Sequence, residues 1–408
     1  MSSRSTTFAV GLYGIPIGRL TGDEQWWLEF DPEYVERYPR PVLGQWFEDR
    51  DLRKARQSRG LLPYFRNLLP ERSALRTVVA LSNGFSTEDE LELIACLGAD
   101  LPGASTVTTT VAHPHPERAI LEEQRTVAPA FRFSLAGIQP KMSVRLSDDY
   151  RTVLPVSGED GQWILKLPNA EYPKLVEREY GTMCWARDSG FEVPEVRLID
   201  AGSVMDVPSA LKMGDGPCYL IRRYDRVEEG GRIHQEDFAQ VLDHQPADKY
   251  GCTIVRLSQV VLRVMGRAQH ERFLDRLVFD IMAGNGDAHL KNWSIVYPDP
   301  DGRVPTLAPC YDIVPTILYP KLDPSPGLKF PGSPRFSAID SMCFKKLLRQ
   351  TPTLPEHTWD RLARVATRIA DAWSTRSRDY LEERDADVLS RHMEQVPVVR
   401  EWLGLTAK

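Results

Sequence analysis

The chain has 408 residues, of which 42% are hydrophobic, so it is long enough for about two to three well-packed domains and is not a disordered protein. Its 51 basic and 57 acidic residues give a net charge of −6, which argues against binding nucleic acid through overall charge. The six cysteines are scattered without a CxxC pair, no apolar run reaches the roughly 18 residues of a membrane span, and the N-terminus lacks a signal-peptide core. We therefore expect a soluble, cytoplasmic protein with reduced, buried cysteines, no zinc site, no disulfide framework and no membrane partner.

The N-terminal region predicts a β-hairpin followed by helices. Apolar residues alternate over Phe8–Leu12, Tyr13-Gly14 offers a tight turn, and a second strand follows over Ile17–Leu20. Further along, the apolar spacing over Glu88–Leu97 predicts a helix, with Thr87 as the first residue of a capping box.

Residues 102–123 form a threonine- and proline-rich stretch that predicts an exposed connection. His113 and His115 lie within it, and two histidines alone offer a metal too few ligands. We therefore interpret this stretch as a solvated linker and keep a metal site as the alternative.

A second block follows the linker and has the element order of a kinase small lobe. A small-residue loop over Ser134–Lys141 leads into a strand, and a lysine-bearing strand then precedes a helix that ends at Gly190. The strands are expected at 142–146, 163–167, 196–200 and 218–224, and the helix at 177–189.

From Asp225 onward the pattern becomes helical. Helices are expected at 235–242, 257–265 and 271–283, and short strands at 293–297 and 304–307. A later amphipathic helix carries Trp359, Leu362, Val365, Ala366, Ile369 and Trp373 on one face. Its other face carries Arg361, Arg364 and Arg368, which we interpret as a solvated face, with a partner or nucleic-acid contact as the alternative.

The most specific motif is Asp287, then Asn292 five positions later, then Asp312 beyond a hairpin. Phosphoryl transfer of the kinase type uses an aspartate to accept the proton of the attacking hydroxyl, and an amide and a second carboxylate to hold magnesium. A purely structural loop is the alternative, but the preceding helix and the following hairpin favour the catalytic interpretation.

Three neighbours of Asp287 have supporting roles. His289 is expected mainly to orient the loop through hydrogen bonds. Lys291 would steady a transferred phosphate, or would simply be solvated. Asn285 would hold the loop through side-chain to backbone hydrogen bonds.

Lys166 lies inside an apolar run, where burying an unpaired ammonium is costly, so we expect it to meet phosphates and a carboxylate, with exposure to solvent as the alternative. Glu179 on the following helix would be that carboxylate, and Glu177 remains open as the partner. In the loop, Gly137 permits close approach of a phosphate, although a GxGxxG pattern is missing.

The end of the last small-lobe strand is where a kinase hinge meets adenine. Tyr224 would pack against the base there, or would be an ordinary core residue.

With these motifs in place, the chain resembles the HipA family of serine/threonine toxin kinases along nearly its whole length. The segments that carry the resemblance are FRNLLPE (65–71), LGADLPGA (97–104), SLAGIQPK (134–141), ILKLP (164–168), EREY (177–180), RRYDR (222–226), HQEDFAQVL (234–242), GNGDAHLKNWS (284–294) and APCYDI (308–313).

The resemblance implies an α+β, protein-kinase-like bilobal fold with an added N-terminal α/β subdomain. The expected limits are 1–125 for the subdomain and linker, 126–225 for the small lobe and 226–408 for the mostly helical large lobe. It implies a serine kinase that uses ATP and Mg²⁺, with Asp287 as proton acceptor, His289 and Lys291 beside it, and Asn292 and Asp312 as metal ligands. The implied nucleotide contacts are Ala136, Gly137, Ile138, Gln139, Lys141, Lys166, Glu179, Arg222, Arg223, Tyr224 and Tyr311.

The resemblance also implies regulation and partners. Ser134 occupies the position that family members autophosphorylate, which ejects the nucleotide loop; a plain loop serine is the alternative. Family members pair with a HipB-like helix-turn-helix antitoxin, bind operator DNA mainly through it, and phosphorylate targets such as an aminoacyl-tRNA synthetase.

Two other functions use the same residues. A small-molecule phosphotransferase of kinase-like fold needs the same two aspartates and asparagine. A catalytically silent corepressor bound to an antitoxin would not need them, and their presence argues against it.

Overall fold

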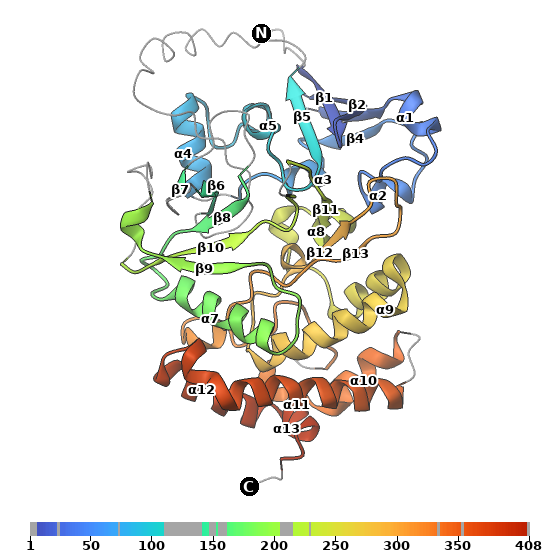
Figure 1. The fold of residues 1–408 in the computed structure, drawn as a ribbon. Helices are drawn as coiled ribbons and strands as arrows, with labels where there is room; N and C mark the ends of the chain where they lie inside the picture. The colour runs from blue at the N-terminus through green and yellow to red at the C-terminus, as the bar shows by residue number, and fades with distance from the viewer. Residues whose placement is uncertain are drawn as a thin grey trace. The chain divides into compact units, whose positions relative to one another are not determined.

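The computed structural model describes residues 6–22, 25–71, 74–109, 141–146, 152–153, 161–204, 215–227, 230–332, 335–351 and 355–405 (Figure 1). His113, His115, Ser134, Ala136, Gly137, Ile138 and Gln139 lie outside the described residues, so the predictions for them stay predictions. The chain divides into two compact units. Unit 1 comprises 1–170, 199–246 and 296–303, and unit 2 comprises 171–198, 247–295 and 304–408. The three-part domain division expected from the sequence remains a prediction.

Unit 1 contains an antiparallel sheet in the order β4-β3-β2-β1-β5. Its strands are β1 (Thr6–Leu12), β2 (Ile15–Gly22), β3 (Gln25–Phe30), β4 (Arg56–Arg59) and β5 (Ser105–Thr109). The β1–β2 hairpin confirms the sequence prediction, because Tyr13 and Gly14 both take positive φ values of 53° and 74°, as a tight two-residue hairpin turn requires.

A second sheet of unit 1 shares the same hydrophobic core. Its strands lie in the order β7-β6-β8-β10, with β6 (Lys141–Leu146), β7 (Thr152–Val153), β8 (Trp163–Lys166) and β10 (Cys218–Arg222). Phe8 and Leu20 from the first sheet and Met142, Leu165 and Leu220 from the second belong to one cluster of buried side chains. The N-terminal sheet and the small-lobe strands are therefore one folding unit, held by shared apolar burial.

The other elements of unit 1 are α1 (Pro32–Glu36), α2 (Gln45–Glu48), α3 (Pro63–Arg66), α4 (Ala74–Asn83), α5 (Glu90–Leu97), η1 (Ala201–Ser203), β11 (His234–Asp237) and α8 (Phe238–Val241). The capping box predicted at Thr87 is wrong, because Asp89 caps α5 by accepting a hydrogen bond from the backbone of Glu92. The helix predicted over 235–242 is also wrong in its first half. Strand β11 occupies that half, and the capping box of Asp237 and Gln240 starts the helix later.

Unit 2 is mostly helical. Its helices are α7 (Leu175–Asp188), α9 (Ile254–Met282), α10 (Ser341–Arg349), α11 (Pro355–Tyr380), α12 (Glu383–Gln395) and α13 (Pro397–Trp402), with short 3-10 turns η3 (Leu290–Asn292), η4 (Thr316–Leu318) and η5 (Phe336–Ala338). Three short elements include the sequence positions at which the chain passes from one unit to the other: η2 (Pro246–Asp248), β9 (Val196–Ile199) and β12 (Ser294–Tyr297). The strand β13 (Thr306–Leu307) belongs to unit 2. The two helices predicted over 257–283 are the two halves of α9, which is kinked at Gly266 (φ 77°).

The face of α11 that the sequence marked as apolar is buried, as predicted. Trp373 packs on Trp185 of α7 with ring centroids 4.5 Å apart, and the Trp185 indole donates to the backbone oxygen of Ile369 (3.0 Å). The interpretation of the arginine face as solvated is wrong at one position, because Arg361 forms an ion pair with Asp275.

All six cysteines are free and buried, as the sequence predicted. Within the part of the chain that the structure describes, no helix is both long and apolar enough to cross a bilayer.

Candidate active site

The loop that carries the motif begins where α9 ends, at a point that only glycine fits. Gly284 has φ 63°, and a Cβ there would lie 2.6 Å from the Ile317 side chain. The next residue, Asn285, is buried: its amide nitrogen donates to Asp280 Oδ1 (2.8 Å) and its amide oxygen accepts from the Asp287 backbone (3.1 Å). Asn285 therefore ties the loop to α9, as its predicted structural role required.

Asp287 presents its carboxylate at the surface of unit 2. Its side chain is 44% exposed, and Oδ1 accepts a hydrogen bond from the Tyr250 hydroxyl (2.5 Å). His289 is buried with Nε2 3.7 Å from the same oxygen, and its ring meets the Tyr250 ring edge-on at 5.0 Å. The phenol holds the carboxylate by a hydrogen bond and the imidazole lies beside it, beyond hydrogen-bond distance, so the orienting role of His289 stays a prediction.

Asn292 is turned so that its amide oxygen is left for a ligand. Its amide nitrogen donates to the Asp287 backbone oxygen (2.7 Å), and its backbone nitrogen donates to that of His289 (2.9 Å). Because the nitrogen is committed to the loop, the amide is fixed in one orientation and the oxygen is the atom available to bind a cation.

A buried arginine braces both segments that carry the predicted metal ligands. Arg276 Nη2 donates to the backbone oxygens of Asn292 (2.7 Å) and Tyr311 (3.4 Å), and the guanidinium lies 4.1 Å from the Trp293 ring centroid. Next to Tyr311, Asp312 has φ 52°, a strained left-handed conformation for a residue other than glycine. Such strain is typical of functional sites and is maintained here by the surrounding contacts.

Tyr311 takes part in a hydrogen-bond network through its hydroxyl, and its expected nucleotide contact stays a prediction. Its hydroxyl shares a hydrogen bond with Ser294 (2.5 Å) and donates to the Lys291 backbone oxygen (3.1 Å). Lys291 itself is buried, with a 7% exposed fraction, so its alternative as a solvated lysine is wrong.

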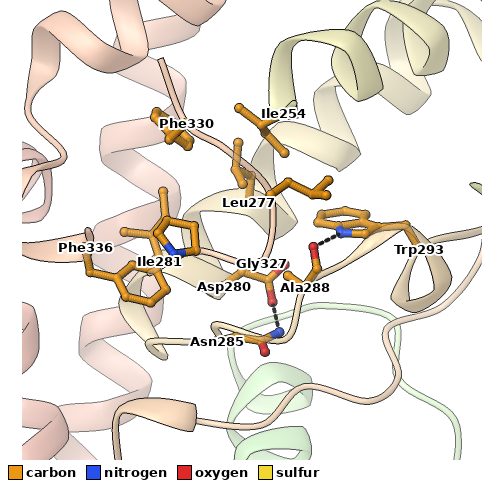
Figure 2. A pocket seen from close by; sticks show the side chains of 12 residues that line it. Ile254, Leu277, Asp280, Ile281, Asn285, Ala288, Trp293, Gly327, Phe330 and Phe336 are labelled. Atoms are coloured by element: carbon orange, nitrogen blue, oxygen red, sulfur yellow. Dashed lines mark hydrogen bonds between the residues drawn. The ribbon is translucent and has the colours of Figure 1, made fainter. Parts of the chain in front are cut away.

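A small cavity of about 20 Å³ lies beneath the loop, with room for one water molecule (Figure 2). Asp280, Asn285 and Ala288 line it together with apolar side chains of α9. Burial raises the pKa of Asp280, while the charge of Arg276, whose Nε lies 3.7 Å from Oδ2, and the Asn285 hydrogen bond oppose the rise. Gly327 also lines the cavity and packs closely against the loop, because a Cβ at Gly327 would lie 2.5 Å from the backbone nitrogen of Ala288.

In unit 1, the predicted nucleotide residues Lys141 and Lys166 are paired across the sheet. They are opposed residues of β6 and β8, and Tyr219 of β10 opposes Lys166 from the other side. Lys166 is 3% exposed with Nζ 5.6 Å from the Tyr219 ring centroid, so its alternative as a solvent-exposed lysine is wrong. Unit 2 holds Glu179 on α7, where it is fully buried while Glu177 is partly exposed.

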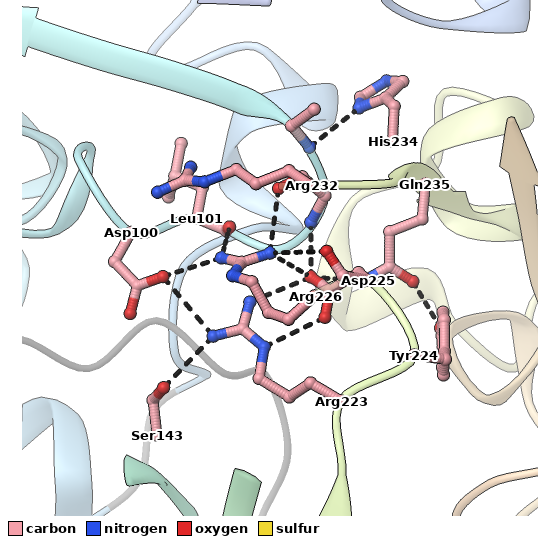
Figure 3. A network of polar contacts seen from close by, with 12 residues as sticks. Asp100, Leu101, Ser143, Arg223, Tyr224, Asp225, Arg226, Arg232, His234 and Gln235 are labelled. Atoms are coloured by element: carbon pink, nitrogen blue, oxygen red, sulfur yellow. Dashed lines mark hydrogen bonds and ion pairs between the residues drawn. The ribbon is translucent and has the colours of Figure 1, made fainter. Parts of the chain in front are cut away.

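The predicted hinge begins with Arg222, which ends β10 opposite Trp163, and continues into a buried ionic cluster (Figure 3). Arg223 and Arg226 both bind the Asp225 carboxylate, at 2.9 and 2.7 Å, and both reach Asp100, at 3.4 and 2.7 Å. Burial alone would raise the pKa of Asp225, but the two guanidinium groups outweigh burial and lower it.

This cluster explains two of the sequence motifs at once. The Asp225 carboxylate also accepts from the Gly103 backbone (2.8 Å), and Arg226 donates to the Leu101 backbone oxygen (3.0 Å). The segments 97–104 and 222–226 therefore lock the N-terminal sheet region to the end of β10. Arg223 further donates to Ser143 Oγ (3.1 Å), and its backbone nitrogen donates to Gln162 (2.8 Å), so its side chain and N–H are both committed to structure. Tyr224 is half-buried and its hydroxyl bonds Gln235.

Tyr250, Arg276 and Asp280 contact the site but were not singled out from the sequence. Arg276 and Asp280 had a detectable signal, because opposite charges four residues apart stand within the largely apolar stretch FLDRLVFDIM, which also contains Asp275. Tyr250 had none, since it lies 37 residues before Asp287 in a turn without a periodic pattern.

The chemistry of the donors suits magnesium. Asn292 and Asp312 offer an amide and a carboxylate oxygen, which are the ligands that Mg²⁺ prefers. Within the described ranges, no group of three or more histidine, cysteine, aspartate or glutamate residues gathers as a metal site. A cation at Asn292 and Asp312 would therefore complete its shell with water and phosphate oxygens.

Mixed helices and sheets in this arrangement define a kinase-like α+β fold, and comparison with known proteins gives its family. A model of the HipA N-terminal domain matches residues 8–108, and a model of the HipA-like C-terminal domain matches residues 133–378. The chain belongs to the HipA family.

Relatives and solved structures agree with this assignment. Y4dM of Sinorhizobium fredii is 34% identical and aligns over 97% of this chain and 98% of its own length. The serine/threonine-protein kinase toxin HipA of Shewanella oneidensis is 26% identical over 62% of each chain. A solved complex of Shewanella oneidensis HipA, HipB and operator DNA matches with a TM-score of 0.72 at 20% identity, covering 98% of this chain and 100% of that chain. At this low identity, the structural match shows that this chain has the same fold as that HipA protein.

Proposed function

We propose that the protein is an ATP- and Mg²⁺-dependent serine/threonine-protein kinase that acts as the toxin of a HipA/HipB-like toxin-antitoxin pair. The observation that carries the proposal is the Asp287 loop. A half-exposed carboxylate is held by the Tyr250 hydroxyl with the His289 ring beside it, while the neighbouring Asn292 amide is fixed with its oxygen available. A loop serving only structure would not need to hold a carboxylate at the surface.

Four residues of the site have defined tasks in this mechanism. Asp287 accepts the proton of the attacking hydroxyl, so the oxygen becomes a stronger nucleophile as the phosphoryl group transfers. Asn292 and Asp312 hold Mg²⁺, which supplies positive charge for the phosphate oxygens when it is bound with ATP. Arg276 keeps the backbone of both ligand segments in place.

The nucleotide contacts would come from the small-lobe strands and the hinge. Lys166, with Lys141 opposed to it, would meet the phosphates together with the loop 136–140, and Glu179 would pair with Lys166, since it is buried where Glu177 is not. At the hinge, the side chain and the backbone N–H of Arg223 already have partners within the protein, so the adenine contacts would come from main-chain groups of Arg222 and Tyr224.

The toxin assignment is supported by family membership and by the Shewanella relatives. We propose a HipB-like helix-turn-helix antitoxin as the partner, with operator DNA bound mainly through it because this chain is acidic overall. A cytoplasmic translation component, such as an aminoacyl-tRNA synthetase, would be the substrate, and Ser134 the autophosphorylation site. A phosphate on Ser134 would add about −1.5 to −2 charges beside the nucleotide phosphates, which accounts for self-inactivation.

The test is phosphosite mapping by mass spectrometry after incubation with Mg-ATP, alone and with an extract of cytoplasmic proteins. The native chain is compared with Asp287→Asn and with Asp301→Asn, a matched change at an exposed aspartate in a surface turn. We expect phosphate on Ser134 and on a protein acceptor, reduced by at least about 100-fold in D287N and unchanged in D301N.

Other outcomes separate the competing functions. ATP consumption with transfer only to small metabolites would indicate a small-molecule phosphotransferase. ATP binding with no transfer to any acceptor would indicate a corepressor.

A further inference from the structure

The hydroxyl of Tyr250 occupies the place of an acceptor hydroxyl. A general base must lie within hydrogen-bond reach of the proton that it removes, about 2.6–3.2 Å between heavy atoms. Tyr250 Oη donates to Asp287 Oδ1 at 2.5 Å, so the phenol proton already points at the proposed proton acceptor. The short distance is typical of an O–H group bound to an ionised carboxylate.

The backbone around Tyr250 holds the phenol there. Residues 248–251 form a tight turn in which the Gly251 backbone nitrogen donates to the Asp248 oxygen (2.8 Å), with Tyr250 at the third position. The preceding Lys249 oxygen accepts from the Leu290 backbone (3.1 Å), which joins this turn directly to the loop of Asp287. The turn and the catalytic loop therefore keep a fixed spacing.

The side chain of Tyr250 is nevertheless accessible. It is 44% exposed, although the edge of the His289 ring packs on it at 5.0 Å. A core tyrosine would be fully covered, and a tyrosine used only to orient Asp287 would not need to face solvent. Lys249 Nζ lies 5.7 Å from the ring centroid and supplies positive charge on this side.

From these observations we propose that Tyr250 is a phosphoryl acceptor of the protein's own active site, a tyrosine autophosphorylation site separate from Ser134. The inference rests on the proposed kinase function. In the transfer, the bond between Tyr250 Oη and the γ-phosphorus of ATP forms while the bond from that phosphorus to the bridging oxygen breaks and ADP leaves. The phenol proton passes to the Asp287 carboxylate.

The modification would change the site in a predictable direction. A phosphate on Oη places about two negative charges beside the Asp287 carboxylate, and like charges at such a distance repel. The phosphorylated side chain would also occupy the position of an incoming substrate hydroxyl. Phosphorylation of Tyr250 would thus lower transfer to other acceptors.

The first test is mapping of phosphotyrosine in the full chain after incubation with Mg-ATP. We expect phosphate on Tyr250 in the native protein, at least about 100-fold less in Asp287→Asn, and none in Tyr250→Phe. Tyr38 is 89% exposed and serves as the internal control, since simple accessibility would modify it first.

The outcomes distinguish this inference from the function on which it rests. Phosphate on Ser134 or on another protein with none on Tyr250 overturns the inference and leaves the kinase proposal standing. Phosphate on Tyr38 as abundant as on Tyr250 also overturns it, because positioning would then play no part. No phosphate on any acceptor refutes the kinase proposal and the inference with it.

A second test needs no nucleotide. N-acetylimidazole acetylates accessible phenols, and mass spectrometry reports each tyrosine separately. With the hydroxyl bound to Asp287, Tyr250 should react several-fold more slowly in the native protein than in Asp287→Ala, while Tyr38 reacts equally in both. Equal reactivity of Tyr250 in the two proteins would overturn the contact on which the proposal is built.

Discussion

Glu236 gives a quantitative prediction for the stability of unit 1. This glutamate is fully buried; its Oε1 accepts from the Tyr297 hydroxyl (2.7 Å) and from the Gln45 backbone (2.9 Å). Burial raises its pKa from 4.5 to about 8, although those two hydrogen bonds oppose the rise. The group is therefore protonated in the folded protein at neutral pH and ionised in the unfolded chain.

The sign of the pH dependence follows from this difference. Between pH 4.5 and pH 8 unfolding releases the proton of Glu236, so its contribution to the free energy of unfolding is fully present below pH 4.5 and is lost as pH rises toward 8. Between pH 6.5 and pH 8 the two pKa values give a loss of about 1.5 kcal/mol, at about 1.36 kcal/mol per pKa unit. Glu236→Gln keeps a neutral acceptor for both donors and should abolish this loss.

The assay is denaturant-dependent hydrogen exchange of peptides from β1 and β2 at pH 6.5 and 8, because these strands report on unit 1 rather than on the whole chain. Glu29→Gln, at an exposed position of β3, is the matched control and should behave like the native protein. If Glu236→Gln loses as much stability as the native protein between the two pH values, the carboxyl is not the source and the reasoning is refuted.

Three further predictions concern other contacts. Asp225→Asn leaves two buried arginines without their shared carboxylate and should cost about 3–5 kcal/mol of unfolding free energy in the same assay; native stability would contradict the ionic cluster. Gly327→Ala forces a Cβ against Ala288, so phosphate transfer by the proposed kinase should fall by about 100-fold, and an unchanged rate would show that the Asp287 loop does not depend on this close contact. Arg276→Lys loses the Nη2 contacts to the backbone of Asn292 and Tyr311 and should raise the Mg²⁺ concentration for half-maximal transfer by the proposed kinase, whereas an unaltered magnesium titration would remove its positioning role.

Local patterns were sufficient for several elements and for the centre of the candidate site. The β1–β2 hairpin, both halves of α9 and helix α7 follow from periodicity and turn residues, which act over a few positions. The spacing of Asp287 and Asn292 likewise predicted that the two residues share one loop, and in the structure the Asn292 amide donates a hydrogen bond to the Asp287 backbone oxygen. Lys166 was expected to meet phosphates and a carboxylate because its neighbours are apolar; its burial excludes the solvent-exposed alternative, and the phosphate contact stays a prediction.

Other features depend on segments far apart in the chain, and only the tertiary structure decided them. Arg223 was expected to contact the nucleotide from the hinge, yet its charge is neutralised by Asp225 and by Asp100, which precedes it by 123 residues. Tyr250 meets Asp287 across 37 residues. Glu236 accepts hydrogen bonds from Gln45 and Tyr297, which are 191 and 61 residues away, and the burial that raises its pKa outweighs these two bonds. Sequence periodicity indicates which side of an element faces inward. The partner that a buried charge or hydroxyl meets there is set by long-range packing, because desolvation makes each buried polar group bind whatever donor or acceptor the fold brings within reach.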